Sequence, residues 1–86
     1  MTGRDRIVIQ KIAGYIRDAI SFTANFDFES FMRDKKTLSA SAFAIGQIGE
    51  LVRELSDEAQ TDNPQIPWKN IRGMRNRIVH DYENID

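Results

Sequence analysis

The sequence has 86 residues, which allows one domain and leaves no room for a second. Hydrophobic residues make up 41% of it and charged residues 29%, a composition typical of globular domains and too apolar for a disordered chain. There is no cysteine and one histidine, which excludes disulfides, thiolate zinc sites and a multi-histidine metal site within one chain.

The sequence also argues against a membrane protein. Its apolar runs are far shorter than the roughly 18 residues that span a bilayer. The N-terminus is charged and has no apolar signal core behind it. Together with the absence of cysteine, these features favour a cytoplasmic protein with no membrane partner, no metal and no cofactor.

Charge is distributed unevenly along the chain. The net charge is −1, whereas a general nucleic-acid binder would normally be basic. Residues 63–80, however, contain no Asp or Glu and carry four positive charges, on Lys69, Arg72, Arg75 and Arg77. Any nucleic-acid binding is therefore expected at this local basic segment.

The first expected helix covers residues 5–24. One apolar stripe at helical spacing supports it, formed by Ile9, Ile12, Ala13, Ile16, Ala19 and Ile20. Asp27 can then cap a short helical turn that carries Phe28 and Phe31.

A second long helix is expected over residues 34–56, and it is apolar on two sides. Its main stripe consists of Leu38, Ala42, Ile45, Ile48, Gly49, Val52 and Leu55. A further strip consists of Ala40, Phe43, Ala44 and Leu51. Because a helix with two apolar faces needs a partner on each, the first helix covers one, and a third helix or a second copy of the chain covers the other.

Residues 57–67 are polar, contain two prolines and predict a loop. A third helix is expected over 67–81, with Pro67 in its first turn and Ile71, Met74, Ile78 and Tyr82 as its buried stripe. No segment alternates convincingly between apolar and polar residues, so no strand is expected. The fold class is therefore all-α: a small antiparallel helical bundle formed by a single domain of residues 1–86.

The third helix carries the residues of chemical interest. Arg72, Asn76 and His80 stack along the face opposite its apolar stripe. Arg75 lies beside the stripe, so its guanidinium must extend outward or meet a partner across an interface. Gly73 is either a tolerated poor helix residue or a point where a phosphate or another backbone comes close.

Arginine, asparagine and histidine at a basic helix suggest chemistry on a phosphodiester. Arginine matches phosphate oxygens with a planar fork of donors, and histidine exchanges protons near neutral pH. With RNA the 2′-hydroxyl is the nucleophile, so no metal is required, and a two-fold dimer supplies two copies of His80 as base and acid. The alternative is a structural histidine on a solvated basic face. Tyr15, Trp68 and Tyr82 are interpreted as core or interface aromatics.

The segment from Pro67 to Tyr82 resembles the signature of the HEPN superfamily, an Arg and a His separated by four residues. Here these are Arg75 and His80, with Asn76 after the arginine and Tyr82 two residues after the histidine. This longer form resembles the HepT-like toxin branch. Residues 31–37 and 45–50 are also similar to that branch, so the resemblance covers most of the chain.

The resemblance implies an all-helical domain that dimerises so that both motifs line one cleft. It implies a metal-independent ribonuclease that acts as the toxin of a toxin–antitoxin pair, with an MNT-type nucleotidyltransferase as antitoxin. Arg75 and His80 would be catalytic, Asn76 supporting, and Lys69, Arg72 and Arg77 would bind the RNA phosphates. The antitoxin would transfer AMP to Tyr82 and block RNA binding by repulsion and occlusion.

The resemblance also implies a further helix after the motif, whereas this sequence ends four residues after Tyr82. We therefore expect a bundle that lacks the usual last helix. A second hypothesis follows from this: a non-catalytic HEPN module that binds nucleotide or RNA, or only its nucleotidyltransferase partner. The complete motif favours the ribonuclease, and the short C-terminus favours the binding module.

Overall fold

The computed structural model of the chain describes residues 1–78 and residue 80, and the regular secondary structure in this part is entirely helical. The helices are α1 (Gly3–Thr23), α2 (Phe28–Arg33), α3 (Lys35–Val52), α4 (Asp57–Thr61) and α5 (Trp68–Arg77). The predicted fold class is therefore confirmed, and the described residues contain no strand. None of these helices is both long and apolar enough to cross a lipid bilayer.

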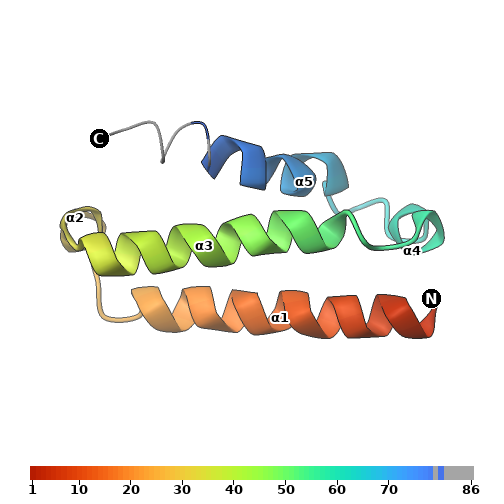
Figure 1. Cartoon of the computed structure of the whole chain (residues 1–86), viewed down its shortest axis with the longest axis horizontal. Helices are drawn as coiled ribbons and strands as arrows, with labels where there is room; N and C mark the ends of the chain where they lie inside the picture. The colour runs from red at the N-terminus through yellow and green to blue at the C-terminus, as the bar shows by residue number, and fades with distance from the viewer. Residues whose placement is uncertain (79, 81–86) are drawn as a thin grey trace.

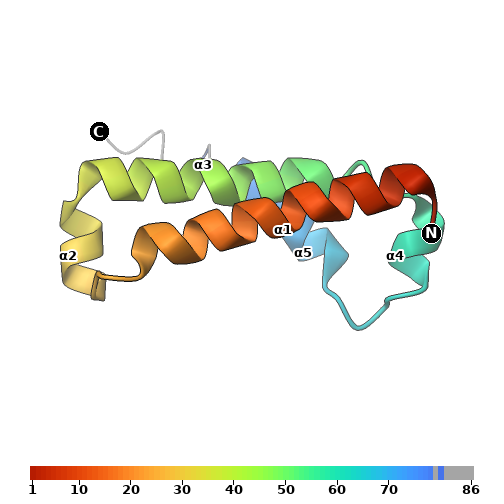
Figure 2. The same cartoon turned by 90° about the horizontal axis from the view of Figure 1, so that it is seen from below.

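Helix α3 is the centre of the bundle. It lies between α1 and α5 and packs against both, while the short α2 and α4 lie at opposite ends of the molecule (Figures 1 and 2). The two-sided apolar pattern predicted for this segment is explained by this position. Ala42, Val52 and Gly49 of the main stripe are buried, as are Ala44 and Leu51 of the second strip.

This arrangement changes the argument for a second copy of the chain. Leu51, from the second strip, packs in a buried cluster with Val8 of α1 and with Leu55. Phe43 is the member of that strip that stays 60% exposed, with its ring edge-on to Tyr15 at 6.1 Å. The second strip is therefore largely covered within one chain and does not by itself require a dimer.

Helix α1 begins two residues earlier than predicted because of a capping box at Thr2. The Thr2 hydroxyl accepts a hydrogen bond from the Asp5 backbone N–H at 2.9 Å, and the Asp5 carboxylate accepts one from the Thr2 N–H at 3.1 Å. These bonds satisfy two of the backbone donors that a helix N-terminus leaves unpaired. Asp27 forms a second capping box with Ser30 at the start of α2, and Asp34 caps α3 by accepting a hydrogen bond from the Thr37 N–H.

The prediction of which side of α1 is buried was partly wrong. Val8 is buried, with 3% exposure, and Ile12 and Tyr15 pack against the same cluster. Ile16 and Ile20 of the predicted stripe are instead 44% and 65% exposed. The reason is that α1 has apolar residues on a wide arc, and the position of α3 selects the side that includes Val8 rather than Ile20.

The predicted loop 57–67 was also partly wrong, because α4 occupies its first half. The Ser56 hydroxyl caps this helix by accepting a hydrogen bond from the Ala59 N–H at 3.1 Å. Helix α3 correspondingly ends at Val52 rather than at Ser56. A serine cap followed by two acidic residues is a standard helix start, although the prolines further on dominate the composition of the segment.

Candidate active site

Helix α5 carries five of the predicted site residues, Lys69, Arg72, Arg75, Asn76 and Arg77, and begins one residue later than predicted, with Pro67 as its N-cap rather than in its first turn. Ile71, Met74 and Ile78, predicted as its buried stripe, are only half-buried. Trp68 packs against the core, and its indole N–H donates to the Gln60 and Asn63 carbonyls at 2.9 and 3.0 Å. The interpretation of Trp68 as a core aromatic is thus confirmed. Tyr82 lies outside the described residues.

Gly49 of α3 sets how closely α5 approaches. A Cβ atom at this position would lie 3.0 Å from the backbone nitrogen of Arg75 and 3.0 Å from the carbonyl oxygen of Ile71. Both contacts are tighter than packed atoms normally allow. The absence of a side chain at Gly49 therefore lets the backbone at Arg75 lie directly against α3.

The side chain of Arg75 turns to the residue that follows this glycine. Its Nε lies 3.2 Å from Oε1 of Glu50, and the two side chains are 48% and 45% exposed. The guanidinium was expected to extend outward or to meet a partner across an interface, and the structure instead gives it a half-exposed partner in the same chain. The charge pattern along α5, which has no acidic residue, gave no sign that α3 supplies a carboxylate to it.

Four further site residues are exposed on α5 or just beyond its end. Lys69, Asn76, Arg77 and His80 all reach solvent. Asn76 lies in the last turn of α5, and His80 lies three residues beyond the end of that helix. This solvent-facing surface can receive a polyanion without the chain having to unfold or move a domain.

Arg72 does not share that exposed surface. It is half-buried, and its Nη1 donates to the side-chain oxygen Oε1 of Gln60 at 2.7 Å. The expected stack of Arg72, Asn76 and His80 on one solvated face is therefore incomplete, because α4 and the turn after it reach back to Arg72. Arg53, which sequence reasoning did not single out, lies nearby, with Nη2 3.4 Å from the Arg72 carbonyl oxygen.

Gly73 has open space around it. A Cβ built at this position would have no atom within 4 Å outside its own helix backbone. Within the described part of the chain, therefore, no other backbone comes close at this position. A tolerated helix glycine and the approach of a phosphate are the two interpretations from the sequence that remain.

In the described residues, no group of three or more His, Cys, Asp and Glu side chains is placed to hold a metal ion.

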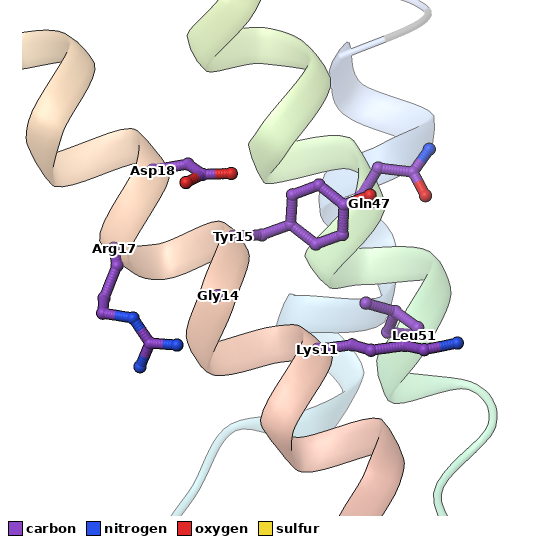
Figure 3. A pocket seen from close by; sticks show the side chains of 7 residues that line it. All are labelled: Lys11, Gly14, Tyr15, Arg17, Asp18, Gln47 and Leu51. Carbon is purple, nitrogen blue, oxygen red and sulfur yellow. The ribbon is translucent and has the colours of Figure 1, made fainter.

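The structure also contains a pocket that lies apart from α5. A pocket of about 550 Å³ lies between α1 and α3, with the Tyr15 ring between the two helices and Lys11 reaching across toward Leu51 (Figure 3). Its lining includes none of the predicted site residues.

The arrangement on α5 has the parts needed to act on a phosphodiester. A guanidinium, half-exposed and held at one edge, can bind phosphate oxygens with its remaining donors. The exposed imidazole of His80 is of the side-chain type that most often serves as a general acid or base. The exposed basic and amide side chains beside them can position a polyanionic chain.

Comparisons with known proteins agree with this description. The profile of a family described as "Ribonuclease HepT-like" matches residues 12–86. A protein of Methanocaldococcus jannaschii named as a candidate RNase is 33% identical over 81 residues, which cover 94% of this chain and 67% of that protein. Another, also named as a candidate RNase, is 32% identical over 87 residues, with 100% and 75% coverage. A protein of Thermococcus cleftensis named as a probable ribonuclease HepT is 33% identical over 78 residues, with 91% and 71% coverage. No solved structure matches the chain significantly.

Proposed function

Since the chain belongs to the HepT-like ribonuclease family, we propose that it is an endoribonuclease that cleaves RNA at the exposed surface of α5. The observation that carries the proposal is the presentation of Arg75 and His80. Arg75 is half-exposed and fixed at Nε, and His80 is exposed a short distance further along the chain. Both lie in residues 63–80, a basic segment without Asp or Glu, which suits a polyanionic substrate.

The proposed reaction is an internal transfer at phosphorus. The RNA 2′-oxygen attacks the adjacent phosphorus and loses its proton to an imidazole, while the bond from phosphorus to the 5′-oxygen breaks and that oxygen gains a proton. The products are a 2′,3′-cyclic phosphate and a 5′-hydroxyl. Arg75 stabilises the added negative charge on the phosphoryl oxygens, and Asn76 donates to a non-bridging oxygen or orients the imidazole. Because the substrate supplies the nucleophile, the mechanism requires no metal.

One histidine cannot readily serve as base and acid in the same turnover, so we propose that two chains pair with both copies of His80 in one cleft. The second apolar strip of α3 does not supply this interface, because Leu51 and Ala44 are buried within the chain. The proposal therefore depends on the need for both a base and an acid in one turnover, and on the resemblance to the family, which implies a dimer. A monomeric mass in sedimentation of the active protein at micromolar concentration would contradict it.

We further propose that the protein is the toxin of a toxin–antitoxin pair, with an MNT-type nucleotidyltransferase as antitoxin. In this scheme the Tyr82 oxygen attacks the α-phosphorus of ATP, pyrophosphate leaves and the phenol proton passes to solvent. The phosphate of the resulting AMP adduct competes with RNA for Arg75 and His80. Mass spectrometry after incubation with the nucleotidyltransferase and ATP should place the adduct on Tyr82. Tyr82→Phe should still cleave RNA and should escape inactivation. An adduct on another residue would contradict this regulatory scheme.

The ribonuclease activity is tested with the purified chain and a labelled single-stranded RNA in EDTA. Wild type should cleave the RNA and leave 2′,3′-cyclic phosphate ends. His80→Ala and Arg75→Ala should each be slower by at least about a hundredfold. Tyr15→Phe, which changes an aromatic residue on α1, is a matched control that should keep its activity. RNA binding without cleavage by wild type would instead favour the non-catalytic binding module.

A further inference from the structure

We infer that Glu50 is a positioning residue of the active site, which holds the Arg75 guanidinium in the orientation that receives a phosphate. The inference deepens the proposed function and rests on it. It starts from the ion pair between Arg75 Nε and Glu50 Oε1 at 3.2 Å, which joins α5 to α3. Nothing in the charge pattern of α5 assigns a role to this carboxylate.

The geometry of the pair leaves the phosphate-binding edge of the guanidinium available. A guanidinium has five N–H donors, one on Nε and four on the two Nη nitrogens. Glu50 contacts the guanidinium at Nε. The Nη nitrogens therefore remain for the fork of two parallel hydrogen bonds that arginine makes with phosphate oxygens. A carboxylate placed across both Nη groups would compete with RNA, whereas one placed at Nε does not.

Gly49 fixes where this contact is made. A Cβ atom built at Gly49 would lie 3.0 Å from the backbone nitrogen of Arg75 and 3.4 Å from the Arg75 Cβ. The base of the arginine side chain is thus pressed against α3 immediately beside Glu50. A long, flexible side chain is thereby held at two points, at its backbone by close packing and at Nε by an ion pair.

The pair is poorly suited to a purely structural role. Both side chains are about half-exposed, and exposed ion pairs contribute little to stability. The orientation of a catalytic group has a larger effect on the reaction rate, because a displacement of about 1 Å can slow an enzyme about a hundredfold. Removing Glu50 should therefore affect catalysis much more than folding.

A second surface ion pair provides the matched control. Arg4 and Glu54 lie 2.9 Å apart, with 71% and 46% side-chain exposure, and this pair lies outside the candidate site. Glu54→Ala removes a carboxylate close in sequence to Glu50 and should change neither the cleavage rate nor the melting temperature appreciably. A general effect of lost negative charge on RNA binding would appear in both variants.

The experiment measures single-turnover cleavage of a labelled RNA in EDTA by wild type, Glu50→Ala, Glu50→Gln and Glu54→Ala. Glu50→Ala should lower the rate at saturating protein by about tenfold to a hundredfold. Glu50→Gln keeps an oxygen that accepts from Nε, so its rate should stay within about threefold of wild type. It should also reach half-saturation at a lower protein concentration, because a negative charge beside the phosphate is gone. A wild-type rate for Glu50→Ala, or equally slow Ala and Gln variants, would overturn the inference.

A measurement on the protein without RNA separates this inference from the proposed function. The Arg75 Nε–H signal in a nitrogen–proton NMR spectrum, assigned by its loss in Arg75→Lys, should exchange slowly with water in wild type. The exchange should become fast in Glu50→Ala and stay slow in Glu54→Ala. If wild type does not cleave RNA, the proposed function fails, and this signal still reports whether Glu50 holds Arg75. An Nε–H signal that is unaffected by Glu50→Ala would overturn the positioning role.

Discussion

The carboxylate of Asp5 accepts two hydrogen bonds from Ser56, one from its backbone N–H at 2.9 Å and one from its hydroxyl at 2.7 Å. Asp5 is 1% exposed and also belongs to the capping box at the start of α1. Ser56 in turn caps α4. One carboxylate therefore fastens the start of the first helix to the start of the fourth, which lies beside it in Figure 2.

We expect Asp5→Asn to destabilise the fold. An amide presents one oxygen, and its NH2 group would face backbone N–H donors that the carboxylate now satisfies. The melting temperature should fall by roughly 5 °C or more, measured by circular dichroism. Asp18→Asn, on an exposed position of the same helix, is the control and should melt close to wild type. Equal melting temperatures for all three proteins would contradict the role of Asp5.

The same carboxylate predicts a dependence of stability on pH. The Ser56 backbone N–H, then the Ser56 hydroxyl and the Thr2 backbone N–H, lower the pKa of Asp5 from 3.8 to about 2. The unfolded chain binds this proton more tightly, so the contribution is fully present above about pH 4 and is lost as pH falls toward 2. Urea midpoints of wild type and Asp5→Asn should therefore differ at pH 5 and converge near pH 2. A constant difference between the two midpoints would argue against this assignment.

Gly49→Ala should be destabilising, because the new Cβ would lie 3.0 Å from two backbone atoms of α5 that cannot move independently. The expected loss in free energy of unfolding is about 1–3 kcal/mol. Gly46→Ala provides the control on the same helix, since Gly46 is buried but a Cβ added there would meet no atom within 4 Å. Alanine there should be neutral or stabilising by up to about 1 kcal/mol. Urea titrations that rank the two variants the other way would contradict the close approach at Gly49.

We expect Arg72 to contribute mainly to stability and Lys69 mainly to RNA binding. Arg72→Ala removes the 2.7 Å hydrogen bond to Gln60 and should cost about 1–2 kcal/mol of stability in urea titrations. Lys69→Ala, at an exposed position, should leave stability unchanged. It should instead lower the slope of log binding constant against log salt by about 0.7 for a single-stranded RNA with 2′-O-methyl groups, which resists cleavage. A loss of stability in Lys69→Ala would contradict this division.

Much of the fold could be predicted from local sequence. Asp27 and Asp34 cap helices where the pattern indicated, and Pro67 precedes α5, because these effects depend on neighbours within one turn. The two-sided apolar pattern of α3 predicted a helix with partners on both faces, and α1 and α5 are those partners. The concentration of Arg75, Asn76 and His80 within six residues is likewise a property of the sequence.

Contacts between distant residues were decided only by the tertiary structure. Helical periodicity placed Ile20 in the predicted buried stripe and left Val8 out of it, whereas the position of α3 determined that Val8 is buried and Ile20 exposed. The Glu50 carboxylate reaches Arg75 because Gly49 admits the backbone of α5, a contact that no local pattern on either helix encodes. Sequence spacing fixes which residues share a face of one helix, but the close packing of separate helices determines what each face meets.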